Sequence, residues 1–144
     1  MAILDIDGLK LRFDARRVDQ LSDDGDGPDE DIVSTAISDA EGLVLNWLSR
    51  NYTQAQIEAD AGAGYLTAVV AMHNLESRRG DITDGVQRLY ALALEMLEKL
   101  RSGDLKLAAL EQVLPSISPG SLTRVYEGST YFEGLVDSED TDNG

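Results

Sequence analysis

Apolar residues recur every three or four positions between residues 29 and 52, and this is the clearest periodic stretch of the chain. The spacing places them on one face of a helix, with polar side chains such as Asp39 and Arg50 on the other. Asp29 and Asp31 stand at the start, where carboxylates accept the unpaired N–H groups of a first helical turn. We therefore predict a central helix whose apolar face consists of Ile32, Val33, Ala36, Ile37, Ala40, Leu43, Val44, Trp47, Leu48 and Tyr52.

Helical patterns also precede and follow this stretch. Residues 5–21 predict a first helix, which Asp5 caps and which breaks near Asp14. A fourth helix is predicted to begin near residue 84, and its stripe of Leu and Met residues is typical of a core. Gly103 stands where this helix should end, at the position that favours glycine after a last turn.

A third helix is predicted over residues 65–77, and it is apolar around most of its circumference, as a helix in the middle of a bundle should be. Gly62 and Gly64 predict a break before it. The fold class is therefore all-α, a small four-helix bundle that forms a domain over residues 1–110. Because the ring of Trp47 falls on the apolar face of the central helix, its replacement by alanine should cost about 3–5 kcal/mol.

Beyond residue 110 the pattern changes. Pro115, Pro119 and Gly120 do not continue a helix, and the apolar residues that follow are spread among Gly, Ser and Thr. We predict that residues 111–144 form an extended C-terminal arm with an acidic tail. Apolar side chains on a segment without a core of its own usually need a partner surface, so we predict partner binding by Tyr126, Tyr131, Phe132 and Leu135.

An acidic loop is predicted over residues 22–31, and its spacing invites comparison with a calcium-binding EF-hand loop. Ser22 would take the first position, Asp24 the third and Asp26 the fifth, but Val33 takes the twelfth, where a glutamate should close the shell. Since the first and twelfth positions lack carboxylates, we predict a solvated turn that caps the central helix. Whether the loop faces a DNA channel or binds a cation stays open.

Composition narrows the class of protein. A chain of 144 residues is most simply one domain that buries a core. It has no cysteine, which excludes disulfides and thiol catalysis and fits an intracellular site of folding. It has no run of eighteen apolar residues, and its first residues carry acids early in place of a basic segment followed by an apolar one. We therefore expect neither a membrane span nor a signal peptide.

Charge and candidate chemistry favour a binding role over a catalytic one. The net charge of −15 repels nucleic acid at long range. It serves solubility, or it lines a surface past which DNA slides without sticking, and composition alone does not choose. His73 is the only histidine, without a cysteine or second histidine as a partner, so we interpret it as structural. We predict no catalytic residues, no metal site and no cofactor, and hence no enzyme.

The order of the pieces carries a family resemblance over residues 3–107. The first helix, with Leu9 and Phe13, precedes an Asp-Gly-Asp-Gly turn. The central helix then closes with Leu-Ser-Arg-Asn-Tyr at residues 48–52, and the last helix closes with Leu-Glu-Lys-Leu at residues 97–100, followed by Gly103. In this order they resemble the Mu-like phage family of small head–tail connector proteins. The chain departs from the family in having no proline in the link after Tyr52.

The resemblance implies a non-enzymatic virion protein of the head–tail junction, made in the host cytoplasm. As an adaptor, or head-completion protein, it would bind below the portal protein as a ring of identical copies, expected to be twelve-fold like the portal. It would continue the DNA channel towards a downstream stopper or tail protein, with DNA passing but not bound specifically. The alternative is an acidic intracellular regulator or DNA mimic that binds one basic protein.

Overall fold

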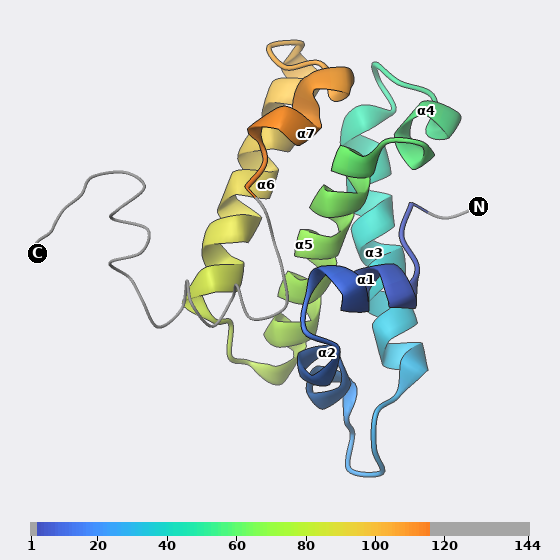
Figure 1. Cartoon of the computed structure of the whole chain (residues 1–144), viewed down its shortest axis with the longest axis vertical. Helices are drawn as coiled ribbons and strands as arrows, with labels where there is room; N and C mark the ends of the chain where they lie inside the picture. Colours follow the sequence, from blue (N-terminus) through green and yellow to red (C-terminus); the bar gives the residue numbers. More distant parts are fainter. Residues whose placement is uncertain (1–2, 116–144) are drawn as a thin grey trace, which may run out of the picture.

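The computed structural model describes residues 3–115, and every regular element in this range is helical (Figure 1). The all-α class is therefore confirmed for the described part of the chain. Of the predicted extended arm over residues 111–144, residues 111–113 are helical instead and pack back on the domain, and residues 116–144 lie outside the described range. The elements are α1 (Ile6–Arg12), α2 (Ala15–Ser22), α3 (Glu30–Leu48), α4 (Gln54–Glu58), α5 (Ala61–Arg79), α6 (Asp84–Ser102), a 3-10 turn η1 (Leu107–Ala109) and α7 (Leu110–Val113).

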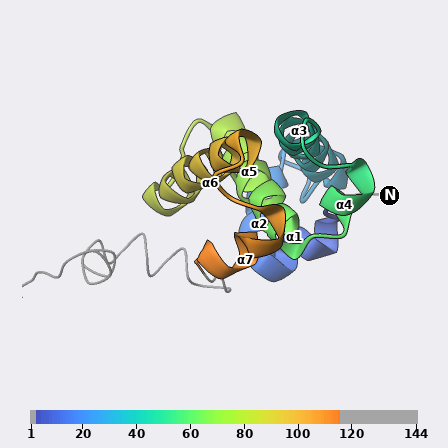
Figure 2. The ribbon, with the colours of Figure 1, turned by 90° about the horizontal axis from the view of Figure 1, so that it is seen from above.

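Three helices of 19 residues, α3, α5 and α6, run side by side and form the body of the domain (Figures 1 and 2). The short helices α1 and α2 pack across α3 and α5 as a pair. Together they replace the single first helix of a simple four-helix bundle, with the predicted break at Asp14, which caps α2. The predicted boundary between residues 110 and 111 falls at the start of α7, which packs back against α5.

The helix at the centre of the domain is α5, which contains the helix over residues 65–77 that we predicted for the middle of the bundle. The helix over residues 29–52, which we predicted as the central one, packs beside it. The helix α5 packs against α1, α2, α3, α4, α6 and α7. All its residues from 62 to 72 are buried, because neighbours cover it on every side. The helix α3 has one apolar face, as predicted, and this face covers one side of α5.

The predicted break at Gly62 and Gly64 is wrong, because α5 begins at Ala61 and contains both glycines. The carboxylate of Asp60 caps it by accepting the N–H of Ala63 at 3.0 Å. Gly62 is there for close packing: a Cβ at this position would lie 2.7 Å from Cδ2 of Leu110. Sequence pattern alone does not separate a glycine that ends a helix from one that admits a neighbour.

Helix ends follow the predicted capping chemistry elsewhere. Asp5 caps α1 and Asp29 caps α3 through their carboxylates. The helix α6 ends at Gly103, whose φ of 92° is the left-handed conformation that glycine adopts without strain. These residues set where α1 and α3 begin and where α6 ends. These helices pack against α5, so their positions determine which side chains meet there.

Candidate functional site

The predicted partner-binding residues lie outside the described part of the chain. Tyr126, Tyr131, Phe132 and Leu135 all belong to residues 116–144, so the geometry that bears on them is that of the segment from which the arm starts. We call this segment, η1 and α7 together with its contacts at the N-terminal end of α5, the arm base. A second group of polar contacts lies at the C-terminal end of α5.

The arm base is held against α5 by close packing. Leu110, the first residue of α7, is fully buried and lies over Gly62. Leu107 is also buried, and its backbone N–H donates to the hydroxyl of Tyr52 at 3.1 Å. Because a methyl group at position 62 would clash with the Leu110 side chain, α7 can sit this close only on a glycine.

Asn51 joins the end of α3 to the end of α6. Its Nδ2 donates to the carbonyl of Leu100 at 3.1 Å and to that of Arg101 at 2.9 Å. These carbonyls belong to the last turn of α6, where backbone oxygens lack partners within the helix. The Asn-Tyr pair that follows α3 therefore fixes both the end of α6 and the turn that leads into α7.

Trp47 lies at the same end of the molecule and is half-buried, which corrects the expectation of a fully buried ring. The guanidinium of Arg101 stands 4.4 Å from the ring centroid, the geometry of a cation–π contact. Arg101 also pairs with Glu98 on α6. The ring thus covers the junction of α3 and α6 from outside instead of filling the core.

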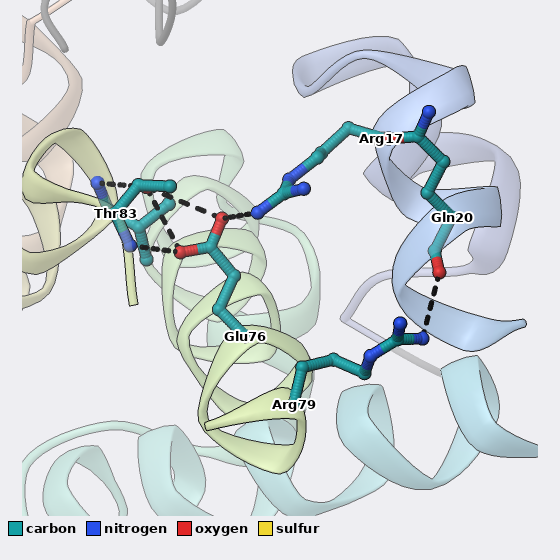
Figure 3. Close-up of polar contacts among 6 residues, drawn as sticks. Arg17, Gln20, Glu76, Arg79 and Thr83 are labelled. Carbon is teal, nitrogen blue, oxygen red and sulfur yellow. Dashed lines mark hydrogen bonds and ion pairs between the residues drawn. The ribbon is translucent and has the colours of Figure 1, made fainter. Parts of the chain in front are cut away.

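At the C-terminal end of α5, a buried carboxylate joins three helices (Figure 3). Glu76 is fully buried, and Nη2 of Arg17 on α2 lies 3.3 Å from its Oε2. The N–H of Thr83 donates to Oε1 of Glu76 at 2.7 Å, and the hydroxyl of Thr83 donates to the same oxygen at 3.0 Å. Because Thr83 is also the cap of α6, one side chain ties α5 to α2 and to the start of α6.

Two arginines at the end of α5 satisfy the last carbonyls of α2. Nη1 of Arg79 donates to the carbonyls of Gln20 at 3.2 Å and Asp23 at 2.9 Å, and Nη1 of Arg78 donates to that of Leu21 at 3.0 Å. Figure 3 shows the Arg79 contact beside the Glu76 cluster. The positive side chains thus meet the negative end of the α2 dipole.

The acidic loop next to these arginines uses its side chains locally. Oδ1 of Asp23 accepts the N–H groups of Gly25 at 2.8 Å and Gly27 at 3.2 Å, and Oδ1 of Asp24 accepts that of Asp26 at 3.3 Å. Both glycines have positive φ, near 111°. Within residues 3–115, no three acidic or histidine side chains are grouped as metal ligands. The solvated turn predicted for this loop stays a prediction.

His73 packs between helices. Its ring stacks on that of Tyr90 of α6, with centroids 3.6 Å apart and planes 8° from parallel. Burial lowers the pKa of His73 from its ordinary value of 6.5, while the charge of Glu76, one turn away, raises it in part. Its buried Nδ1 has no hydrogen-bond partner in the described region. A neutral ring in an aromatic stack fits the structural role predicted for it.

The sequence reasoning missed Glu76 and Asn51. A carboxylate one turn beyond Met72, on a helix apolar around most of its circumference, was the available signal for Glu76, because a buried charge in such a helix must find a partner. In the sequence, Asn51 stands out only as part of the Leu-Ser-Arg-Asn-Tyr motif at residues 48–52. Its role as a cap for another helix depends on which helix end lies beside it, and pattern does not give that.

The fold and the arm base define the class first: a small all-α protein in which a helical domain leads into a C-terminal segment. The family model described as Bacteriophage Mu, Gp36 matches residues 5–122, and the chain belongs to this family. Membership indicates a role in phage structure or morphogenesis. No curated protein gives a significant match. Among the described residues, no helix is both long enough and apolar enough to cross a membrane.

Proposed function

We propose that this protein is a head–tail connector of the adaptor type, a structural component of the virion and not a catalyst. One observation carries the proposal: the family match spans residues 5–122, so it covers the helical domain from the cap of α1 onward and the first residues beyond the arm base. The protein would bind below the portal as a ring of identical copies, twelve-fold if it follows the portal, and meet a stopper or tail protein on the other side.

The arm would make the attachment. The contacts of Leu110 with Gly62 and of Leu107 with Tyr52 hold the arm base against the core, and this gives the arm a fixed point of departure. Ordering an extended segment on a partner costs conformational entropy. The burial of Tyr126, Tyr131, Phe132 and Leu135 against a neighbour or the portal would offset that cost, helped by the avidity of a closed ring.

The charge of the chain supports a channel role. A wall with a net charge of −15 per copy repels the DNA backbone, so DNA would pass without being retained. The same charge suits an acidic regulator that mimics DNA, the alternative function. The two differ in stoichiometry: a connector joins a multi-copy ring on the portal, whereas a mimic binds one basic partner one-to-one.

The test is a pair of truncations. A chain that ends after Leu114 keeps α1 to α7 and loses the arm, and a chain that ends after Val136 keeps the arm and loses only the acidic tail. We expect the Leu114 chain to unfold at nearly the same urea concentration as the full chain but to leave the portal ring unoccupied in mass photometry. The Val136 chain, as the matched control, should join the ring normally.

Three results would count against the proposal. If the Leu114 chain joins the ring normally, the arm is not the attachment. If the Leu114 chain loses its helical signal in circular dichroism, the arm belongs to the domain core. If the full chain ignores the portal yet binds a basic protein one-to-one, the regulator is the better assignment.

A further inference from the structure

A groove of about 510 Å³ lies between the first turn of α1 and the first half of α3. Its floor is apolar and consists of Leu4, Ile6 and Ile37. Along the α3 side it is lined by the exposed residues Ser34 and Ser38, one helical turn apart. An apolar floor bordered by hydroxyl groups suits a short peptide segment that brings one or two apolar side chains.

The rim of the groove carries four carboxylates, those of Asp5, Asp7, Glu30 and Glu41. Two of them hold the protein's own backbone: Oδ1 of Asp5 caps α1 through the N–H of Gly8, and Oε2 of Glu41 accepts the N–H groups of residues 3 and 4 at 2.8 and 3.1 Å. For the side chains of the other two, Asp7 and Glu30, residues 3–115 offer no hydrogen-bond or ion-pair partner. The groove therefore favours an occupant with a positive charge.

The chain itself contains such a segment. Arg124 is the only lysine or arginine in residues 116–144, and it is flanked by Leu122, Val125 and Tyr126. A single cation between apolar residues, in a region that is otherwise acidic, matches an acidic rim over an apolar floor. The rest of this region carries six acidic residues, which the same rim would repel.

The position of the groove points to a neighbouring copy as the host. The helices α3 and α6 meet near their C-terminal ends. In Figure 1, α7 ends on the α6 side of α5, whereas the first turn of α1 and the first half of α3, which line the groove, lie on the other side. Arg124 lies nine positions after Pro115 in the sequence, so an extended chain reaches about 30 Å between them. A segment that leaves one flank and a groove on the opposite flank form a head-to-tail contact, which closes a ring when the rotation fits.

We propose that residues 122–126 of one copy occupy the α1–α3 groove of the next copy, with Arg124 facing Asp7 and Glu30. The inference rests on the proposed ring, and it assigns two roles to the arm: its first part joins neighbours, and Tyr131, Phe132 and Leu135 remain for the portal.

Cysteine crosslinking tests the contact directly, because the full chain has no cysteine of its own. The variant Ser38→Cys/Val125→Cys is assembled on the portal and oxidised. A contact between copies gives a ladder of covalent multimers on a denaturing gel. The matched control is Ser102→Cys/Val125→Cys, since Ser102 is an exposed serine at the end of α6, away from the groove. It should give no ladder.

A charge exchange tests the cation. Arg124→Glu should lower the affinity of each contact about five-fold, which corresponds to the loss of one exposed ion pair worth about 1 kcal/mol. Because every copy in the ring loses such a contact, the effect on ring occupancy should be larger. Glu30→Lys in the same chain should restore occupancy. Asp39→Lys, on an exposed position of α3 that does not line the groove, should not restore it.

The outcomes separate this inference from the connector proposal. If Ser38→Cys/Val125→Cys gives a ladder and the control variant gives none, the contact between copies is supported. If the doubly substituted chain closes an internal disulfide and stays monomeric, the arm folds onto its own groove and the inference is wrong. If the ring forms without a ladder, the connector role stands and the contact is wrong. If neither ring nor ladder forms, the connector proposal and the contact between copies are both wrong. If a ladder forms without portal binding, only the contact between copies is supported.

Discussion

The two ends of α5 are held by opposite kinds of interaction. At its C-terminal end, a fully buried carboxylate, Glu76, takes up donors from Arg17 and Thr83 and so joins α2, α5 and α6. At its N-terminal end, α7 is held by close packing: Leu110 lies against Gly62, where a side chain would clash with it. Removing one partner of a buried polar contact strongly lowers the free energy of unfolding. A short helix held only by close packing can instead detach while the rest of the domain stays folded.

This difference would suit the proposed connector, which folds alone and then joins an assembly. The polar end couples three helices, so its loss should weaken the whole domain. The packed end concerns a helix of four residues at the edge, so its loss should free the arm base and leave the bundle folded. Substitutions at each end separate these two behaviours, from the largest expected effect to the smallest.

Glu76→Ala should lower the free energy of unfolding by about 3 kcal/mol, because it leaves Arg17 and the N–H of Thr83 without their acceptor. The value is below that of a completely buried pair, since the Arg17 side chain is about one-third exposed. Urea unfolding measures it. The control is Glu98→Ala, which removes an exposed pair with Arg101 and should change stability by less than about 1 kcal/mol. Equal losses in the two variants would contradict the account of this end.

Trp47→Ala should cost about 2 kcal/mol, less than the 3–5 kcal/mol expected for a buried ring, because the ring is half-buried and part of its contribution comes from Arg101. A double-mutant cycle with Arg101→Ala should find a coupling of about 0.5–1 kcal/mol. A loss above about 4 kcal/mol would mean that the ring is a core residue after all.

Gly62→Ala should displace α7 with a global change of less than about 1 kcal/mol, because the added methyl group meets Leu110 while alanine favours the helix itself. Hydrogen exchange should show lost protection at residues 107–113 and unchanged protection in the middle of α5. Gly42→Ala on α3 is the matched control, since a Cβ there meets nothing within 4 Å. Unchanged protection in the Gly62 variant would refute the close packing.

His73 should make a small, pH-dependent contribution. Because burial lowers its pKa in the folded state, the unfolded chain binds a proton more readily below the ordinary value of 6.5. Its contribution is therefore complete above pH 6.5 and falls as the pH drops below that value. The melting temperature of the wild type minus that of His73→Gln should decrease by no more than about 3 °C from pH 7.5 to pH 5. A difference that increases towards low pH would show the opposite shift.

Most helix positions follow from local chemistry in the sequence. Asp5, Asp14, Asp29 and Thr83 cap the helices that follow them, and Gly103 closes α6. The apolar spacing of α3 and α6 predicted which faces are buried, because residues three or four positions apart lie on the same face of a helix. The family resemblance was also within reach of the sequence, since it rests on the order of these same elements.

What the tertiary structure decided is which elements meet. The most regular apolar stripe suggested α3 as the central helix, and the fold gives that place to α5, which is buried on every side from residue 62 to residue 72 and which admits neighbours at close range near Gly62 and Gly64. The roles of Glu76 and Asn51 depend on helix ends that are distant in sequence, 59 residues for Arg17 and about 50 for the last carbonyls of α6. Local propensity carries no information about such partners, since only packing brings them within hydrogen-bond distance.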